Sequence, residues 1–353
     1  MTLSQSDLRT LTTASCSESF DRDSLILNGE EADVSGARTQ ACFRELRARR
    51  VALEAKDASL PKLSAMHLRI VSENNFPTAA GLASSAAGFA ALVRAIADLY
   101  ELPDSPTELS LIARQGSGSA CRSLLGGYVA WRAGEKEDGT DSLAEQVADA
   151  SHWPGMKALI LVVSAGKKLV PSTSGMQQTV ATSSLFKQRV DAVVPVHMKA
   201  MEEAIRDRDF AKFAEVTMKD SNSFHATCLD TYPPIIYMNE YSKAAIRAVQ
   251  LINVAAGKTV AAYTFDAGAN PVIYYPEEES EAVVGTLFSV LSERPGWKEP
   301  EAYKGLKAAV ALDDIGSFLA EGVNRVIMTG VGDGPVKSDQ FLIAEDGSPV
   351  KTN

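Results

Sequence analysis

The order of hydrophobic and polar positions along the chain predicts a mixed α and β protein, because it shows two different periods. Strands are expected where apolar residues alternate with polar ones or form short runs bounded by turn residues. Segments of this kind cover 8–14, 24–27, 67–71, 127–131, 157–163, 259–263 and 324–329. Helices are expected where apolar residues recur three and four positions apart. Segments of this second kind cover 38–55, a stretch from Ser84–Ser85 to Tyr100, 184–194 and 196–205, with Pro195 separating the last two.

A tight turn is predicted directly after the strand at 24–27. The dipeptide Asn28-Gly29 follows that strand, and it favours a two-residue hairpin because both residues adopt positive φ readily. We therefore expect the chain to reverse direction there.

The length of 353 residues predicts two domains. The pattern is interrupted at His152-Trp-Pro154-Gly155, so a boundary is expected near 151–155. We expect an N-terminal domain of residues 1–155 and a C-terminal domain of residues 156–353, which ends with the strand at 324–329 and a polar tail.

Composition and charge exclude several classes of protein. Hydrophobic residues make up 45% and charged residues 23%, which is enough apolar surface for a core and argues against general disorder. Lys and Arg number 35 against 45 Asp and Glu, a net charge of −10. This charge argues against non-specific binding to nucleic acid or an anionic membrane, although a local basic patch could survive it. The longest apolar run, 158–163, is far shorter than the roughly 20 residues of a membrane span. The first ten residues lack the basic and apolar regions of a secretion signal, so we expect a cytoplasmic protein.

Cysteine and histidine are dispersed, with no CxxC, HExxH or HxH spacing. They occur at Cys16, Cys42, Cys121, Cys228, His67, His152, His197 and His225. This pattern predicts reduced thiols in a cytosol and no zinc site.

Four arginines lie close together in the predicted helix at 38–55. They are Arg44, Arg47, Arg49 and Arg50. A solvated helix face is the favoured interpretation, and a rim that attracts phosphate is the alternative.

The segment 74–88 joins a predicted strand to a predicted helix through a loop of very small residues. Small residues leave backbone N–H groups uncovered, and a helix N-terminus adds partial positive charge, so the arrangement suits phosphate oxygens. Ser84 and Ser85, in the first turn of the helix, could offer hydroxyls to a phosphate or to its Mg²⁺. A strand-to-helix turn with a serine cap explains the same residues. The loop contains neither the Walker sequence nor GxGxxG.

Two further clusters have residues that suit chemistry. In the first, Ser117 and Ser119 are expected on one side of an extended stretch, with Arg122 three residues on. Hydroxyls and a guanidinium can bind a carboxylate or a diphosphate, although a flexible linker with an incidental arginine is the alternative. In the second, Asp266 and Gly268 follow the strand at 259–263. Asp266 is either a turn residue or a carboxylate base.

Taken together, these segments resemble a known family. The stretch Pro77-Thr-Ala-Ala-Gly81-Leu82-Ala83-Ser84-Ser85 resembles the Pro-x-x-x-Gly-Leu-x-Ser-Ser phosphate loop of the GHMP kinase superfamily. With 116–122, 218–229 and 263–270 added, the chain resembles mevalonate diphosphate decarboxylases, the fungal and animal members more than the bacterial ones. Asn222-Ser-Phe-His-Ala226 and Asp266-Ala-Gly268 are particularly telling, since sister kinases do not share them in this form.

The resemblance implies an α+β fold of the GHMP kinase type, with two domains and a deep cleft between them that holds the active site. It implies that ATP phosphorylates the tertiary 3-hydroxyl of (R)-5-diphosphomevalonate, after which phosphate and CO₂ leave to give isopentenyl diphosphate. This carboxy-lyase step belongs to the mevalonate pathway of isoprenoid and sterol biosynthesis. The cofactors implied are ATP and Mg²⁺, and the assembly implied is a homodimer. Because the phosphates of ATP hold most of the Mg²⁺, no protein metal site is expected.

The resemblance also assigns roles by position. Asp266 matches the catalytic carboxylate at the 3-hydroxyl, Arg122 the residue that holds the substrate carboxylate, and Ser85 the serine that orients the γ-phosphate. Substrate-binding positions are expected at Arg38, Ser117, Gly118, Ser119, Ala120, Cys121, Arg122 and Thr173. ATP- and phosphate-binding positions are expected at Pro77, Ala80, Gly81, Leu82, Ala83, Ser84 and Ser85. Residues 218–225, including His225, are assigned to the scaffold.

One departure from the family is expected to matter. Members normally begin with a strand and an Asn-Ile-Ala…Lys-Tyr-Trp-Gly-Lys stretch, which this sequence does not contain. We expect a missing strand, an open sheet edge and the loss of a lysine and a tyrosine from the site. Two alternatives to the decarboxylase therefore remain: a truncated, non-catalytic relic of the family, or a sister GHMP kinase that stops at phosphoryl transfer.

Overall fold

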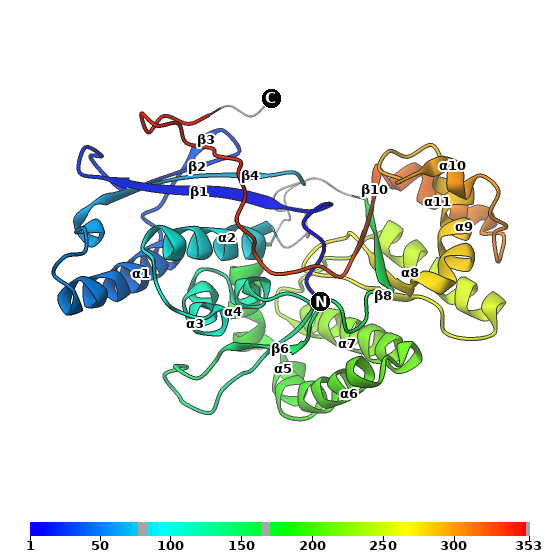
Figure 1. The fold of residues 1–353 in the computed structure, drawn as a ribbon. Coiled ribbons are helices and arrows are strands. Elements are labelled where there is room, and N and C mark those ends of the chain that lie inside the picture. Colours follow the sequence, from blue (N-terminus) through cyan, green and yellow to red (C-terminus); the bar gives the residue numbers. More distant parts are fainter. Residues whose placement is uncertain (77–83, 164–169, 351–353) are drawn as a thin grey trace. The chain divides into compact units, whose positions relative to one another are not determined.

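The structure is a computed structural model that describes residues 1–76, 84–163 and 170–350. The described residues form two compact units (Figure 1). The first unit contains residues 1–76, 84–150 and 332–350, and the second contains 151–163 and 170–331. Each unit has its own sheet and its own core.

The sheet of the first unit has the strand order β1-β4-β2-β3. Its strands are β1 (Thr10–Ser17), β2 (Ser24–Leu27), β3 (Glu30–Ala32) and β4 (His67–Asn74). β1 pairs antiparallel with β4, and β2 pairs parallel with β4. The hairpin predicted between β2 and β3 is confirmed, because Asn28 and Gly29 have φ values of 51° and 83°, as a two-residue turn requires.

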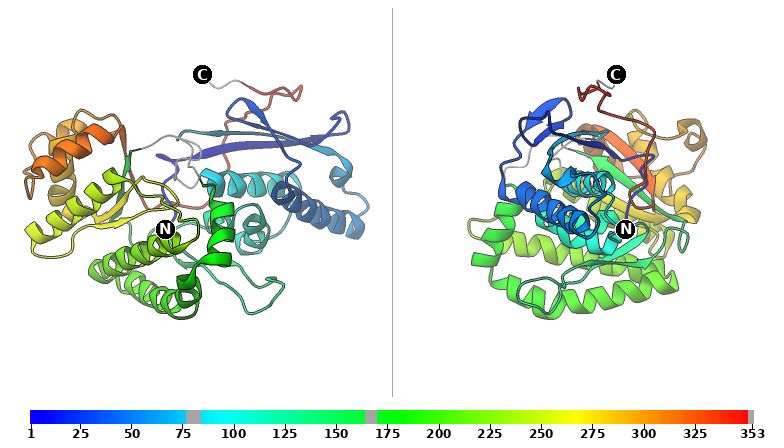
Figure 2. Two further views of the ribbon diagram at one scale, coloured as in Figure 1. Left: turned by 180° about the vertical axis from the view of Figure 1, so that it is seen from behind. Right: turned by 60° about the vertical axis from the view of Figure 1, so that its left-hand side comes forward.

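Three helices cover one face of this sheet, α1 (Ala37–Lys56), α2 (Ser84–Leu99) and α3 (Pro106–Gly116) (Figures 1 and 2). Their apolar faces meet the strands in one core, where Phe43, Ile70 and Ile96 are fully buried. Ser105 and Glu108 form a reciprocal capping box that starts α3.

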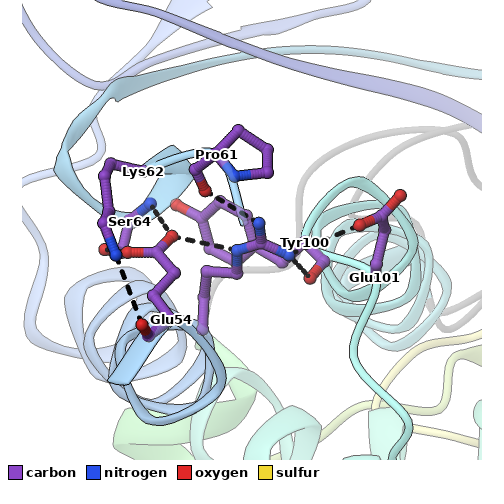
Figure 3. Close-up of polar contacts among 7 residues, drawn as sticks. Glu54, Pro61, Lys62, Ser64, Tyr100 and Glu101 are labelled. Atoms are coloured by element: carbon purple, nitrogen blue, oxygen red, sulfur yellow. Dashed lines mark hydrogen bonds and ion pairs between the residues drawn. The ribbon is translucent and has the colours of Figure 1, made fainter. Parts of the chain in front are cut away.

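The arginine-rich helix α1 is only partly a solvated face, because Arg44 is exposed but Arg50 is not. Arg50 is fully buried rather than solvated. Its guanidinium donates to Glu54 Oε1 at 3.0 Å and to the carbonyl oxygens of Tyr100 and Pro61, each at 2.8 Å (Figure 3). Arg47 pairs with Asp23. These arginines connect α1 to neighbouring loops, and burial of a charge is tolerated because each donor has an acceptor.

The rest of the first unit consists of short elements and the C-terminal tail. The short elements are η1 (Leu63–Ala65), η2 (Gly118–Leu124) and the antiparallel pair β5 (Tyr128–Trp131) and β6 (Ala144–Ala148). In the tail, Leu342 N–H donates to Thr13 Oγ1 at 3.0 Å, and Arg69 donates to the Gly347 carbonyl at 2.8 Å. The tail thus packs with the first unit, whereas the sequence-based division groups it with residues 156–353.

The sheet of the second unit is antiparallel, in the order β10-β7-β9-β8. Its strands are β7 (Met156–Val162), β8 (Ala262–Thr264), β9 (Val272–Pro276) and β10 (Arg325–Gly330). β7 is a central strand, and its apolar run is buried on both faces.

Helices pack on both faces of this second sheet. One core joins β7 to α8 (Glu240–Ala256), α9 (Ser280–Leu291) and α11 (Asp313–Gly322). On the other face, α7 (Phe210–Asp230) packs against β8 and β9, and α6 (Val194–Asp207) packs against α7. Shorter helical elements are α4 (Ser172–Thr182), α5 (Ser184–Gln188), η3 (Arg189–Val193), η4 (Glu277–Glu279) and α10 (Pro300–Tyr303). Within the described part of the chain, no helix has the length and apolar character needed to cross a membrane.

The prediction that Pro195 separates two helices is wrong. The interruption is a π-helical turn, η3, and Pro195 lies in the first turn of α6. A proline in the first turn of a helix costs little, because the N–H group that it lacks would have no intrahelical acceptor there. The helical path before it continues through the wider π turn. Asp220 of α7 fixes this joint by accepting hydrogen bonds from Arg189 and His197, each at 3.0 Å.

Candidate active site

Two of the predicted phosphate-binding residues open a long helix in the first unit. Ser84 and Ser85 are the first two residues of the 16-residue α2. Their hydroxyls therefore lie at the end of the helix whose partial positive charge favours anions. The other predicted members of this loop, Pro77, Ala80, Gly81, Leu82 and Ala83, lie outside the described residues.

The structure brings the start of α2 and the cluster around Ser117 together. The hydroxyl oxygens of Ser85 and Ser117 are 3.3 Å apart, although 32 positions separate them in the sequence. The contact arises because α2 packs against both α3 and η2. Two hydroxyls at this distance can donate to neighbouring oxygens of one phosphate group.

The extended stretch expected around Ser117 and Ser119 is wrong beyond Ser117. Ser117 is extended, but Gly118–Leu124 forms the 3₁₀ helix η2. Close packing of aromatic rings explains the tight turn. A Cβ atom on Gly118 would lie 2.8 Å from the Trp131 ring, and one on Gly116 would lie 2.1 Å from the Phe89 ring. The segment fits beneath these rings because it lacks side chains there.

Arg38 belongs to the same neighbourhood. It is the second residue of α1, and its guanidinium lies 6.0 Å from the centre of the Phe89 ring, within the range of a cation–π contact. Phe89 in turn covers Gly116, next to Ser117. Arg38 is thereby held near the Ser85–Ser117 pair.

Residues 120–122 differ in what their side chains can reach. Ala120 and Cys121 are fully buried, so only their backbone can contact a ligand. Burial raises the pKa of the Cys121 thiol to about 11, although the charge of Arg122 acts to lower it. The raised pKa keeps the thiol neutral. Arg122 itself is half-buried, and among the described residues its guanidinium has no hydrogen bond or ion pair. An unpaired guanidinium of this kind is available to a carboxylate or phosphate.

In the second unit, Asp266 lies on a tight turn. The Gly268 N–H donates to the Asp266 carbonyl at 2.7 Å. The Asp266 side chain is exposed, while Phe265 and Ala267 on either side are buried. The strand predicted at 259–263 is shorter than expected, because the amides of residues 260 and 261 donate to Asn253 Oδ1 instead of a neighbouring strand.

Several side chains that sequence reasoning did not select hold this turn. Ser242 at the start of α8 donates to the Ala269 carbonyl at 2.7 Å, and the Val163 amide donates to Asn270 Oδ1 at 2.8 Å. From α7, Ser221 Oγ accepts from the Phe265 amide at 3.3 Å. The turn therefore presents the carboxylate from a fixed backbone.

Thr173 also lies in the second unit, as the second residue of α4. Gly175 of the same helix lies close to Tyr237. A Cβ atom at this position would be 2.7 Å from the Tyr237 hydroxyl. Burial raises the pKa of Tyr237 to about 12, and the charges of Cys228 and Asp266 add to the shift. Tyr237 thus connects the start of α4 with the surroundings of Asp266.

Metal-binding side chains do not cluster in the described ranges, where no group of three or more His, Cys, Asp or Glu residues could hold an ion. The donors assembled around Ser84, Ser85 and Ser117 are hydroxyls, which fit phosphate oxygens and their Mg²⁺ rather than zinc. A cavity of about 490 Å³ lined by Phe288, Tyr303 and Lys304 includes none of the predicted site residues.

Comparison with known proteins gives a match in each unit. Residues 1–144 match the family model of the diphosphomevalonate decarboxylase-like N-terminal domain, and residues 158–338 match that of the mevalonate 5-diphosphate decarboxylase C-terminal domain. The expectation of a missing N-terminal strand is not borne out by these comparisons, in which the first domain matches from residue 1 onward.

Curated relatives are similar over nearly the whole chain. The diphosphomevalonate decarboxylase of Gibberella zeae is 70% identical over 344 residues, which cover 97% of this chain and 90% of that protein. The enzyme of that name from Aspergillus fumigatus is 62% identical over 357 residues, which cover 98% and 88%.

Solved structures agree with the fold. An X-ray crystal structure of mevalonate 5-diphosphate decarboxylase is 55% identical with a TM-score of 0.89, and the match covers 98% of this chain and 90% of that one. The enzyme from Trypanosoma brucei is 38% identical with a TM-score of 0.79, covering 94% and 87%. A structure of MDDEF in complex with MVAPP, AMPPCP and magnesium is 28% identical with a TM-score of 0.71, again covering 94% and 87%. The predicted α+β fold is confirmed by this likeness.

Proposed function

Because the chain belongs to the mevalonate 5-diphosphate decarboxylase family, we propose that Asp266, Arg122 and Ser85 carry the chemistry of its decarboxylation reaction. The chain is an enzyme of the mevalonate pathway and a carboxy-lyase. The observation that carries the assignment is the Asp266 turn, in which an exposed carboxylate projects from a backbone fixed by hydrogen bonds on several sides.

The substrate we propose is (R)-5-diphosphomevalonate, a β-hydroxy acid whose 3-hydroxyl is a poor leaving group. When bound, ATP supplies a phosphoryl group that converts this hydroxyl into a phosphate ester, whose phosphate is a better leaving group. Asp266 accepts or orients the proton of the 3-hydroxyl, as a general base requires.

Arg122 binds the carboxylate that is lost as CO₂. Its guanidinium is unpaired among the described residues and can make the bidentate contact that fixes a carboxylate plane. Ser117 and Ser119 position the substrate with their hydroxyls, Gly118, Ala120 and Cys121 contribute backbone, and Arg38 and Thr173 contact the diphosphate. A substrate held in one orientation loses CO₂ without searching other conformations.

ATP and Mg²⁺ are the cofactors we propose. Ser84, Ser85 and the residues Pro77, Ala80, Gly81, Leu82 and Ala83 bind the ATP phosphates, and Ser85 orients the γ-phosphate. The hydroxyl donors at the start of α2 support this assignment, and the phosphates hold most of the Mg²⁺. In this proposal, residues 1–155 supply the ATP-binding domain and residues 156–353 supply the catalytic aspartate.

We also propose that the protein is a homodimer that acts in the cytoplasm. The family resemblance supports the dimer. The four cysteines, which are all free thiols, support a reducing compartment. Sedimentation velocity tests the first point and fractionation of cells tests the second.

Release of labelled CO₂ tests the proposed function. The 353-residue chain is incubated with carboxyl-labelled (R)-5-diphosphomevalonate, ATP and Mg²⁺, in parallel with the variant Asp266→Asn. We expect release that depends on ATP and falls by on the order of 10³-fold in the variant, because general base catalysis contributes about 10²–10⁴-fold. Near-normal release by Asp266→Asn would overturn the assignment of the base.

A further inference from the structure

Helix α7 makes two hydrogen bonds with the strand end that leads to Asp266. It packs against β8, as Figure 1 shows. Ser221 Oγ accepts a hydrogen bond from the Phe265 amide at 3.3 Å, and the Tyr263 hydroxyl donates to Asn222 Oδ1 at 3.1 Å. The segment assigned to the scaffold is therefore the part of the fold on which the Asp266 turn rests.

His225 lies one helical turn after Ser221 and is buried, with 7% of its surface exposed. Its ring meets the Phe265 ring edge-on at 5.9 Å and the Tyr237 ring edge-on at 6.5 Å. The backbone of Phe265 and the charge of Asp266 both act on the imidazole. The ring thus lies against the residue that precedes the catalytic carboxylate.

The imidazole is a costly choice if packing is its only purpose. Within the described part of the chain, its Nε2 atom is buried and has no hydrogen-bond partner. An unsatisfied buried polar atom is destabilising, and an apolar side chain of similar size would avoid that cost. What an apolar side chain would lack is the polar interaction of the imidazole with the Phe265 backbone.

We propose that His225 is a positioning residue for Asp266, because its buried ring fixes the backbone of Phe265 and hence the direction of the carboxylate. The proposal rests on the proposed function, in which Asp266 is the base. The titratable groups that face the ring are Asp266 from the turn and Tyr237 from the segment before α8. Burial lowers the pKa of His225 and keeps the ring neutral, so it holds the turn without pairing with the Asp266 charge.

Steady-state kinetics of matched variants test the proposal in the full chain. His225→Leu keeps the volume and removes the polar ring nitrogens, and His225→Asn keeps a donor near the ring position. Thr227→Val is the control, because Thr227 is a buried residue of the same helix whose hydroxyl donates to the Ser223 carbonyl and not to the turn.

We expect kcat of His225→Leu to fall about 10-fold, since small misplacements of a catalytic group cost up to about 10²-fold. KM for ATP and for the substrate should stay within about 2-fold, because Ser85 and Arg122 are untouched. His225→Asn should recover kcat to within about 3-fold of the native protein, and Thr227→Val should match it. Unchanged kcat in His225→Leu would overturn the proposal, as would an equal loss in Thr227→Val.

Hydrogen exchange provides a readout that does not depend on turnover. The Gly268 amide, which donates to the Asp266 carbonyl, should exchange faster in His225→Leu and at the native rate in His225→Asn and Thr227→Val. If His225→Leu does not fold, His225→Asn decides the matter alone: native protection supports the proposal, and lost protection with native kcat overturns it.

The variant Asp266→Asn separates this inference from the proposed function. An active Asp266→Asn removes the proposed function and the inference together. An inactive Asp266→Asn combined with a fully active His225→Leu removes only the inference.

Discussion

In the first unit, Gly116 and Gly118 lie against the rings of Phe89 and Trp131, whereas in the second unit the turn around Asp266 is held by hydrogen bonds from side chains. Both segments carry predicted site residues. The first segment is held by close packing, which is possible because its glycines have no side chains. The second segment is held by hydrogen bonds between donors and acceptors. We conclude that the first segment is sensitive to added volume and the second to a lost partner.

Among the substitutions that test this comparison, the largest effect is expected where a site residue is replaced within the closely packed segment. Arg122→Gln should lower turnover by on the order of 10²-fold or more, because the neutral amide no longer stabilises a carboxylate. Arg132→Gln is the matched control, since Arg132 pairs with Glu145 at 2.8 Å on a hairpin of the same unit. An unchanged rate in Arg122→Gln would make Arg122 a structural residue.

A somewhat smaller effect is expected from lengthening the carboxylate on the polar turn. Asp266→Glu keeps the charge but moves it by about one bond, and the fixed backbone of the turn cannot retreat to compensate. Turnover should fall by about 10- to 10²-fold, with unchanged stability because the side chain is exposed. A fully active Asp266→Glu would show that the turn adjusts, and the contrast between the two segments would fail.

Added volume is tested at Gly116. Gly116→Ala would place a methyl group 2.1 Å from the Phe89 ring, and such overpacking costs about 1–3 kcal/mol. Urea unfolding should show this loss, and the double variant with Phe89→Leu should recover at least half of it because the smaller side chain leaves room. Native stability in Gly116→Ala, or no recovery in the double variant, would contradict steric control.

The smallest effect is expected in the pH dependence of stability. Burial lowers the pKa of His225, against the raising influence of the Phe265 backbone and the charge of Asp266. Below an unfolded pKa of about 6.5 the unfolded chain therefore binds a proton that the folded chain does not. Stability is lost as the pH falls from about 6.5 through the folded pKa, and His225→Asn should flatten this part of the curve. Thermal unfolding from pH 5 to 8 measures it, and equal slopes for both proteins would refute it.

Local features of the sequence predicted the local parts of the fold well. The hairpin at Asn28-Gly29 and the strands β7 and β10 depend on adjacent residues or short apolar runs. The small residues before α2 predict a phosphate loop for the same local reason, and this stays a prediction because residues 77–83 lie outside the described part of the chain.

The remaining features depend on partners that are distant in the sequence. The 3₁₀ turn at Gly118 requires the Trp131 ring, and the burial of Arg50 requires carbonyl oxygens from two separate loops. The role of α7 in holding the Asp266 turn depends on Ser221, 45 positions before it in the chain. No periodicity or short motif encodes such contacts, because they exist only after the units have packed.

The return of the tail to the first unit affects the order in which the protein can fold during synthesis. Leu342 and Gly347 bond to Thr13 and Arg69, residues that leave the ribosome more than 270 positions earlier. All of the second unit is translated between these partners. The unit that begins first is therefore completed last, and its sheet waits without the tail while the second unit is made.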